Sequence, residues 1–270
     1  MPTRAEAEIV ERFTDRYRRC CAAPVVAMER EVLGTDYGST GYTTRAQADD
    51  LAIRLQLQPG HWLADIGAGA GWPGLYLAAT SGCRVVATDL PFIGLRRAHE
   101  RARRDGLAGR AVFLVATGPR QPLRPGSFDA VVHTDVMCCL GPKLSVLRAC
   151  RQLLRPGGRL AFTTIHMAPG LDDRQRRRAR RAGPVGVATR AEYPTLITQA
   201  GFADIVHVDV TSDYATTQRA WYKAAEQRAE AIRRLTSDAE FADAQADRRL
   251  TADAIAAGLL RRSLFTARRP

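Results

Sequence analysis

The sequence predicts an α/β fold built on a parallel sheet that is wound on both faces. Two observations lead to this prediction. From residue 61 onward, short apolar runs alternate with amphipathic segments of helical period, and a glycine-rich turn directly follows the first run. Buried strands that alternate with helices form βαβ units and therefore a parallel sheet. The chain has 270 residues, 46% hydrophobic and 25% charged, so it can bury a sizeable core.

Seven short apolar runs predict the strands of this sheet. They span residues 62–66, 84–89, 111–116, 128–135, 159–165, 204–210 and 263–269. Helical patterns lie between most of them, at residues 74–80, 92–104, 143–154 and 192–200. Pro156, Gly157 and Gly158 predict a turn just before the fifth strand.

The segments outside this alternation define the expected domain organisation. Residues 1–57 form an N-terminal helical cap and lid, with a loop rich in Gly, Thr and Tyr at residues 33–44. Residues 58–211 form the core, residues 212–262 a helical insertion that covers the substrate pocket, and residues 263–270 the last strand of the core. We therefore expect one sheet domain that is capped by helices from both ends of the chain.

The net charge of +12 does not by itself indicate a nucleic-acid partner. All basic residues except Lys143 and Lys223 are Arg, a usage typical of a GC-rich genome. Residues 174–181 (RQRRRARR) hold six arginines. This run is interpreted either as a solvated helix or loop, or as a lid near the ligand, since it follows the carboxyl end of a strand. We expect no nucleic-acid partner.

Composition also excludes several other classes of protein. No apolar stretch approaches the roughly 18–20 residues of a membrane span. The N-terminus lacks the apolar centre of a secretory signal, so we expect a cytoplasmic protein with no membrane partner. The six cysteines form no C-x-x-C pair, which favours free thiols and predicts no metal site. The sequence leaves the oligomeric state open.

The glycine-rich turn, DIGAGAG at residues 65–71, carries the chemical information. Its glycines stand between a strand and a helix, where they permit a tight turn and a close approach of ligand to backbone. No Lys follows, which excludes a Walker loop, and Trp72 breaks the dinucleotide pattern G-x-G-x-x-G. Asp65 would repel a pyrophosphate but suits an ammonium group. A ligand with an amino-acid end and a ribose therefore fits best.

These residues resemble motif I of the class I methyltransferases, which bind S-adenosylmethionine. The resemblance extends through GSFDAVVHTDV (residues 126–136), LLRPGGRLAFTT (153–164) and YPTLITQAGFADIVHVDV (193–210). It implies a Rossmann-like sheet of seven strands in the order 3-2-1-4-5-7-6, with the last strand antiparallel. The helical insertion before that strand departs from the short hairpin that is usual in the family.

The resemblance also implies the residues that bind S-adenosylmethionine. Asp89 stands where the family places an acid on the ribose hydroxyls, with Leu90 beside the adenine. Thr117 stands where many members carry an Asp for the adenine amino group, so Thr117, Gly118 or backbone would make that contact. The full set of expected cofactor residues is Tyr42, Thr43, Asp65, Gly67, Ala68, Gly69, Asp89, Leu90, Thr117, Gly118 and His133.

Further residues are candidates for the acceptor side of the site. Tyr37 and Tyr42 resemble the lid tyrosines of small-molecule methyltransferases of the glycine and sarcosine type, in which Tyr42 and Thr43 would bond the carboxylate end of the cofactor. The catalytic candidates, at strand ends, are His133, Asp135 and His166. The expected substrate-pocket residues are Tyr17, Tyr37, Met137, Trp221 and Tyr222.

The resemblance thus implies methyl transfer from S-adenosylmethionine to a small molecule, by in-line displacement in a capped pocket. A specialised-metabolism amine or aromatic heterocycle is the expected acceptor, and S-adenosylhomocysteine the product. Two alternatives remain open. The chain acts on RNA or protein that docks at Arg174–Arg181, or it binds the cofactor without catalysis. The sequence does not decide between N-, O- and C-methylation.

Overall fold

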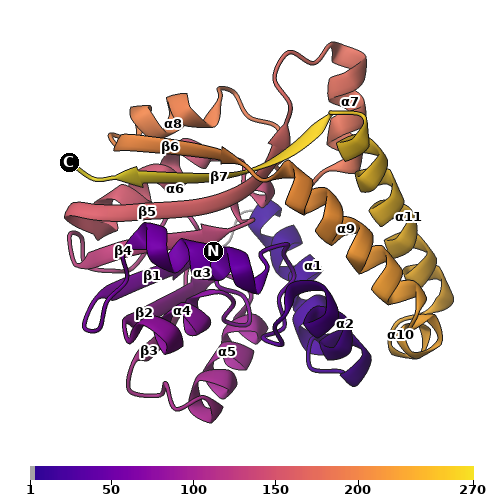
Figure 1. Ribbon diagram of the computed structural model, residues 1–270, viewed down its shortest axis with the longest axis horizontal. Helices are drawn as coiled ribbons and strands as arrows, with labels where there is room; N and C mark the ends of the chain where they lie inside the picture. The colour runs from indigo at the N-terminus through magenta and orange to yellow at the C-terminus, as the bar shows by residue number, and fades with distance from the viewer. Residues whose placement is uncertain (1–3) are drawn as a thin grey trace.

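A computed structural model describes residues 4–270, with side chains from residue 6 onward, and shows one seven-stranded sheet (Figure 1). Its order is β3-β2-β1-β4-β5-β7-β6, as predicted. The strands β1 to β5 pair in parallel, and β7 is antiparallel to both neighbours. The strands are β1 (Trp62–Ile66), β2 (Arg84–Asp89), β3 (Ala111–Val115), β4 (Phe128–Thr134), β5 (Leu154–Met167), β6 (Ala203–Asp209) and β7 (Leu260–Arg268).

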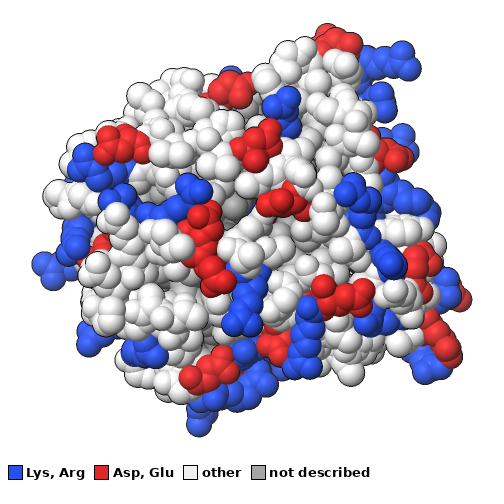
Figure 2. Space-filling view, in the orientation of Figure 1, with Lys and Arg blue, Asp and Glu red and all other residues white. Residues whose placement is uncertain are grey.

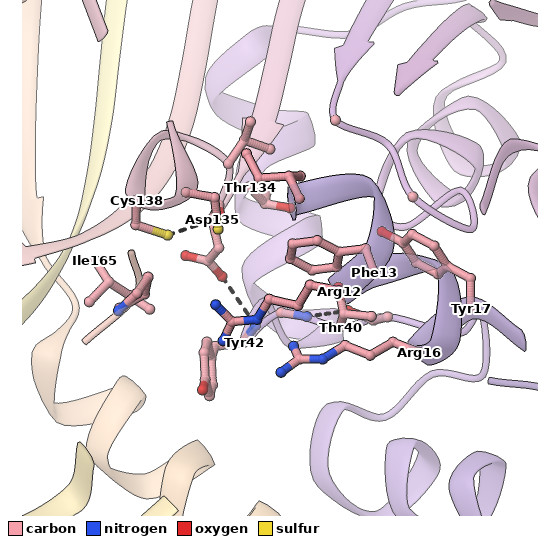
Figure 3. A pocket seen from close by; sticks show the side chains of 18 of the residues that line it. Arg12, Phe13, Arg16, Tyr17, Thr40, Tyr42, Thr134, Asp135, Cys138 and Ile165 are labelled. Carbon is pink, nitrogen blue, oxygen red and sulfur yellow. Dashed lines mark hydrogen bonds between the residues drawn. The ribbon is translucent and has the colours of Figure 1, made fainter. Parts of the chain in front are cut away.

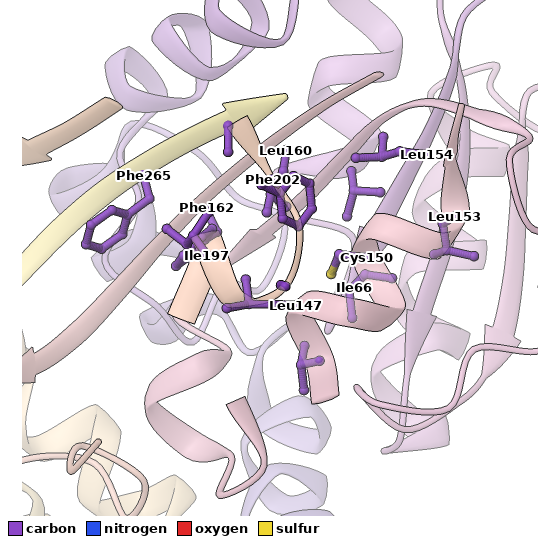
Figure 4. Close-up of a cluster of buried hydrophobic side chains, with 14 of the residues drawn as sticks. Ile66, Leu147, Cys150, Leu153, Leu154, Leu160, Phe162, Ile197, Phe202 and Phe265 are labelled. Carbon is purple, nitrogen blue, oxygen red and sulfur yellow. The ribbon is translucent and has the colours of Figure 1, made fainter. Parts of the chain in front are cut away.

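Helices cover both faces of the sheet through apolar side chains at helical spacing. On one face lie α3 (Arg45–Leu55), α4 (Gly74–Ser81) and α5 (Phe92–Arg104). On the other lie α6 (Lys143–Leu153) and α8 (Tyr193–Gln199), which bury Leu147 and Ile197 against Phe162 and Phe265 of the sheet (Figure 4). Each such buried side chain contributes about 1.5–3 kcal/mol, so these two layers hold the sheet rigidly.

A separate group of helices stands at the carboxyl edge of the parallel strands (Figure 1). It combines α1 (Arg4–Arg19) and α2 (Ala23–Leu33) with α9 (Thr211–Glu226), α10 (Ala229–Leu235) and α11 (Asp238–Ala256). Met28, Ala224 and Phe241 form the small apolar cluster that joins α2, α9 and α11. Segments from opposite ends of the chain therefore build one cap over the edge where parallel αβ sheets bind ligands.

The Arg-rich run forms α7 (Asp173–Ala182), whose first turn is capped by Asp172 and Gln175. The side chain of Asp172 accepts the Gln175 N–H, and that of Gln175 accepts the Asp172 N–H. Ala179 and Ala182 are its buried residues, and its arginines are exposed. The helix is therefore solvated on its charged face, as one of the two interpretations expects.

Two local predictions differ from the structure. The expected turn at residues 156–158 lies inside β5, because α6 leads directly into this long strand at Leu154. Gly157 takes φ of +79° there and donates its N–H to the Arg269 carbonyl, just beyond the end of β7, so the segment stays paired within the sheet. The N-terminal helical segment is also divided, since Pro24 starts a new helix in its first turn.

Candidate active site

A cavity of about 1130 Å³ lies between the carboxyl edge of the sheet and the helical cap. It exceeds the 300–1,000 Å³ that is usual for one bound small molecule, so it has room for two. Many of the residues expected at the site line its wall. These are Tyr17, Tyr42, Thr43, Gly67, Ala68, Gly69, Asp89, Leu90, Thr117, Gly118, Asp135 and Trp221.

The glycine turn after β1 forms one wall of this cavity. Gly67 and Gly69 take φ of +74° and +54°, a region that side chains disfavour. A Cβ on Gly67 would lie 2.4 Å from a methyl of Val136, and one on Gly69 would lie 2.4 Å from the hydroxyl of Tyr17. Tyr17, from α1, therefore rests directly on the turn, and the glycines are required by packing as well as by conformation.

Asp89 ends β2 beside that turn. Its carboxylate accepts N–H groups from Gly69 and Leu90, both at 2.7 Å. Burial raises the pKa of Asp89 to about 6, and these two hydrogen bonds oppose that rise. The carboxylate is thus fixed on the cavity wall, at the strand end where a ribose hydroxyl would meet it.

Thr117 supplies a second polar group at this end of the cavity. Its hydroxyl is buried and has no hydrogen-bond partner among the described residues. A buried hydroxyl without a partner costs free energy, so such a group indicates a position where a ligand completes the hydrogen bond. Together with Asp89 and the turn, it fits the polar edge of a nucleoside.

Asp65 belongs to the support of the turn and not to the cavity wall. It is 1% exposed, and its carboxylate accepts the Gly74 N–H at 3.0 Å, at the start of α4. Burial, with a contribution from the charge of Asp89, raises its pKa to about 7. The prediction that Asp65 contacts the cofactor is therefore corrected: the side chain joins β1 to the helix that follows.

The loop at residues 34–44 closes the cavity between α2 and α3. Buried Glu29 accepts N–H groups from Tyr37, Gly38 and Ser39 at 2.8–3.1 Å, and burial raises its pKa. At the other end of the loop, the Thr43 carbonyl accepts the indole N–H of Trp72 at 2.9 Å. Three N–H donors on one carboxylate hold this loop in a single conformation.

Asp135 and Arg262 form a buried ion pair that fastens this loop to the sheet. The guanidinium of Arg262, which is 0% exposed, donates to both carboxylate oxygens of Asp135, at 2.8 and 3.0 Å. It also donates to the hydroxyls of Thr43 and Thr163, at 2.8 and 3.0 Å. Asp135, with φ of +56°, further accepts the Tyr42 N–H at 3.1 Å.

This pair changes the role expected for Asp135. It does reach the cavity wall (Figure 3), yet its carboxylate is bound by a guanidinium and a backbone N–H. Both carboxylate oxygens are thus occupied by the protein itself, so we place Asp135 as a residue that positions the loop at residues 34–44. Arg262 was not among the expected site residues, since a single Arg in a strand gives no local signal of its partner.

Neither predicted histidine reaches the cavity. His133 is fully buried and stacks on Phe162 at 4.6 Å, and burial lowers its pKa to about 3. Nδ1 of His166 donates to the Met167 carbonyl at 3.0 Å, and Nε2 forms a hydrogen bond with the Ser263 hydroxyl at 2.9 Å. Both side chains point to the face of the sheet under α8, away from the cap, and their catalytic assignment is corrected.

Three predicted substrate residues also lie elsewhere. Tyr37 packs under Arg101, whose guanidinium is 3.8 Å from the ring centre. Met137 is buried in the core beneath α6. Tyr222 faces outward from α9, and its hydroxyl accepts from Arg249 at 3.1 Å. Of the two neighbours that were both expected in the pocket, Trp221 lines the cavity and Tyr222 does not.

The end of the cavity under the cap is lined by residues that sequence patterns did not single out. They come from four helices far apart in the chain. The wall here includes Arg12, Arg16, Met28, Tyr214, Gln218, Phe241, Ala244 and Arg248. Tyr42 packs edge-on against Tyr214, with ring centres 4.7 Å apart, and so joins the lid loop to α9.

Comparisons with known proteins agree with this geometry. A model described as a methyltransferase domain matches residues 64–162. The 27-O-demethylrifamycin SV methyltransferase of Amycolatopsis mediterranei (strain S699) is 34% identical over 195 residues, which cover 71% of this chain and 70% of that enzyme. The chain belongs to the class I S-adenosylmethionine-dependent methyltransferases. This methyltransferase is also 30% identical to Methyltransferase GfsG of Streptomyces halstedii over 63% of its own length and 62% of that protein.

Solved structures share the fold of this methyltransferase. Geranyl diphosphate C-methyltransferase from Streptomyces coelicolor A3(2) matches with a TM-score of 0.74 at 17% identity, over 99% of each chain. Among the described residues, no helix is long and apolar enough to cross a membrane. The same residues hold no cluster of His, Cys, Asp and Glu suited to a metal ion. The enzyme uses S-adenosylmethionine, and the fit of that cofactor is supported by Asp89 and Thr117 at the turn.

Proposed function

We propose that the methyltransferase acts on a small organic acceptor of specialised metabolism, whose amine or aromatic heterocycle is methylated in line within the capped cavity. The observation that carries this proposal is the continuity of the cavity. It reaches from Asp89 at the sheet edge to Phe241 under the cap, with about 1130 Å³ between protein walls. The relative named for 27-O-demethylrifamycin SV supports a small-molecule acceptor, without indicating an amine or heterocycle.

The residues at the sheet edge hold the cofactor in this proposal. The carboxylate of Asp89, the turn at Gly67–Gly69 and the hydroxyl of Thr117 form the nucleoside end. Bound S-adenosylmethionine supplies a methyl group on a sulfonium, which is already a strong electrophile. The protein contributes alignment, by the lid loop and the cap, and exclusion of water, since both substrates are enclosed.

The wall of the cavity supports a nucleophile that needs no strong base. Histidine is absent from the described lining residues, and Asp135 is occupied by Arg262. Two other carboxylates of the wall, Glu6 and Glu240, pair with Arg120 and Arg19, and Asp247 lies at the cap end. A neutral amine or a ring nitrogen carries a lone pair that attacks without prior loss of a proton, whereas a hydroxyl needs a base. N-methylation is therefore the reaction that the wall supports best.

The surface gives less support to an RNA or protein substrate. Figure 2 shows Lys and Arg interspersed with Asp and Glu on this face of the molecule, with no continuous basic groove. The exposed arginines of α7 are the available docking patch, and they face solvent. A macromolecule would also have to thread its methylated group beneath the cap.

The test is calorimetric titration with S-adenosylhomocysteine, followed by a methyl-transfer screen of small amines and heterocycles. Asp89→Asn removes the charge that we assign to the ribose, so we expect binding to weaken by about 10- to 100-fold. Asp238→Asn is the matched control, since its side chain is 91% exposed and far from the turn in sequence. Equal affinity in both variants would remove Asp89 from the cofactor site, and no binding by the wild type would overturn the proposal.

A further inference from the structure

Three guanidinium groups project into the acceptor end of the cavity. Arg12 and Arg16 lie four residues apart on α1, so both occupy one face of that helix. Figure 3 shows them extending from α1 toward Tyr42. Arg248 reaches the same cavity from α11, on the other side of the cap. We call Arg12, Arg16 and Arg248 the arginine cluster.

The electrostatic influence of each group on the others shows that they converge. Burial lowers the pKa of Arg16, and the charge of Arg12 lowers it further. Burial also lowers the pKa of Arg248, and Arg16 is one of the charges that contribute. Burial raises the pKa of Tyr42, while Arg16 and Arg248 both oppose that rise. Arg16 and Arg248 therefore both lie near the phenol of Tyr42, and Arg12 lies beside Arg16 on the same cavity wall.

In the described part of the chain, no carboxylate forms an ion pair with this cluster, although the charges of Asp247 and Glu226 act on Arg248 and raise its pKa against the effect of burial. Among the residues whose side chains are described, none forms an ion pair with Arg12, Arg16 or Arg248. Within the part of the chain that the structure describes, their guanidiniums form one hydrogen bond, from Arg248 to the side-chain oxygen of Gln245 at 2.6 Å. Other arginines of the cap are paired: Arg19 with Glu240 at 3.0 Å, and Arg228 with Glu31 at 2.8 Å.

The contact with Gln245 directs Arg248 rather than neutralising it. Gln245 is 2% exposed, and its amide donates to the Tyr222 carbonyl and to the carboxylate of Glu226. Its remaining oxygen is thereby aimed at Arg248. On the same wall, the buried side-chain oxygen of Gln218 has no partner in the described structure. The acceptor end is thus built from polar groups that the protein leaves unsatisfied.

Like charges that line one cavity and have no ion-pair partner destabilise a folded protein unless a ligand neutralises them. Guanidinium groups bind carboxylate and phosphate oxygens in bidentate geometry. We propose that the arginine cluster binds an anionic group, a carboxylate or a phosphate, on the methyl acceptor. This inference rests on the proposed function and narrows its acceptor to a molecule that carries an anion.

The cluster also suits the nucleophile that the cavity wall supports. A positively charged environment disfavours protonation of a nearby amine. An acceptor anchored by its anion at the arginine cluster would therefore keep its amine neutral and able to attack. Binding and activation of one acceptor then come from the same charges.

The test uses the enzyme loaded with S-adenosylhomocysteine and three simple probes: inorganic phosphate, pyrophosphate and benzoate. Calorimetry and thermal unfolding measure each probe against wild type, Arg16→Gln and Arg248→Gln. We expect at least one probe to bind and raise the Tm, with the affinity at least tenfold weaker in both variants. Phosphate or pyrophosphate as the tightest probe identifies a phosphate acceptor, and benzoate identifies a carboxylate.

Two neighbouring arginines provide matched controls. Arg18→Gln lies on the same helix but pairs with Asp15, and Arg249→Gln follows Arg248 but contacts Tyr222 outside the cavity. Both should bind the probes as the wild type does. Arg16→Gln should also raise the Tm of the free enzyme, because it relieves repulsion, while leaving the affinity for S-adenosylhomocysteine within twofold.

The result that overturns the inference is distinct from failure of the proposed function. If S-adenosylhomocysteine binds normally but the probes bind equally to the wild type, Arg16→Gln and Arg248→Gln, the arginine cluster is no anion site. If S-adenosylhomocysteine itself does not bind to the wild type, the proposed function fails first.

Discussion

The two ends of the cavity differ in how the chain builds them. The cofactor end comes from the carboxyl ends of neighbouring parallel strands. Here β1, β2, β3 and β4 pair in a fixed register, which sets the positions of the residues that follow each strand. The acceptor end comes from helices at residues 4–33 and 211–256, joined by the small cluster around Met28 and Phe241. Polar groups at the first end are mostly bonded by the protein, as in Asp89, while those at the second are left unpaired.

This difference separates what a methyltransferase must share with its family from what distinguishes it. In a parallel sheet, the pairing of the strands sets the positions of the residues that bind the cofactor at their carboxyl ends. The cap has no such constraint, because helices packed on small clusters tolerate changes of side chain and of angle. The acceptor is therefore chosen at the end of the cavity that the fold does not dictate.

The largest effect is expected at the ion pair that joins the two ends. Arg262→Ala leaves Asp135 buried without its cation, and breaking a buried pair on one side costs about 3–5 kcal/mol. It also releases Thr43, so the lid loop loses its attachment to β7. We expect the free energy of unfolding, measured in urea, to fall by that amount, and affinity for S-adenosylhomocysteine to fall at least tenfold.

The adjacent residue gives the control for this experiment. Arg261 is half-exposed, and its guanidinium is 3.5 Å from Asp209, so Arg261→Ala should cost at most about 0.5 kcal/mol. Equal losses from both substitutions would show that the buried pair does not fasten the loop. A loss of stability without a loss of affinity would show that the lid does not contribute to cofactor binding.

Much of the cofactor end was predictable from the sequence, because its signals are local. The turn at Gly67–Gly69 and the strand that ends at Asp89 lie in continuous patterns, and the structure places them on one wall. The seven strands and their order were likewise predicted. Asp65 shows where such a prediction stops. The sequence places it at the end of β1, just before the glycine turn, but does not give the direction of its carboxylate, which accepts the Gly74 N–H and lies outside the cavity wall.

The acceptor end was less predictable, because its residues meet only through tertiary packing. Arg16 and Arg248 are 232 positions apart in the numbering, and each has the sequence context of a solvated helical residue. The prediction for His133 was wrong in the opposite direction: a polar residue near a strand end was expected at the site, but it is buried in the core. Successive side chains along β4 point to opposite faces of the sheet, which sets the direction of His133. A strand that is buried on both faces shows no alternation of polar and apolar residues, so its sequence does not reveal that direction.

The second-largest effect is expected for Asp65, on the cofactor side, and it is a change in how the free energy of unfolding depends on pH. Folded Asp65 holds its proton up to a pKa of about 7, whereas the unfolded chain releases it near pH 4. The folded form thus binds more protons between these values, and this contribution to stability is lost as pH rises from about 4 to 7. Asp65→Asn removes that loss.

We therefore expect Asp65→Asn to gain stability relative to the wild type by about 3 kcal/mol between pH 4.5 and pH 8. Urea unfolding of both proteins at the two pH values measures the change. Asp50→Asn, a partly exposed acid on α3 that pairs with Arg54, is the control and should show no such gain. A difference that is the same at both pH values would mean that Asp65 is ionised throughout.

A smaller effect tests whether His133 belongs to the core or to the site. Neither ring nitrogen has a partner in the described structure, and burial lowers the pKa of the ring to about 3. His133→Phe keeps the stacking on Phe162 and removes two unsatisfied polar atoms, so we expect a gain of about 1 kcal/mol. Methyl transfer should stay within twofold of wild type, and a tenfold loss would return His133 to the catalytic residues.

The smallest effect is expected on α7, and it separates the acceptor end from the outer surface. Arg174, Arg177 and Arg178 are exposed and lie outside the cavity wall, unlike Arg16. Changing these three to Gln should alter the free energy of unfolding by at most about 0.5 kcal/mol. Methyl transfer to an acceptor found in the screen should remain within twofold of wild type from 50 to 200 mM salt. An RNA substrate would instead show a raised KM and a shallower salt dependence in this variant, because each phosphate contact releases counterions.

The α7 variant also serves as a charge control for Arg16→Gln. Since Arg16→Gln removes a single charge and the α7 variant removes three, a larger effect of Arg16→Gln on methyl transfer cannot be ascribed to net charge. The position of the charge relative to the acceptor would then account for the difference.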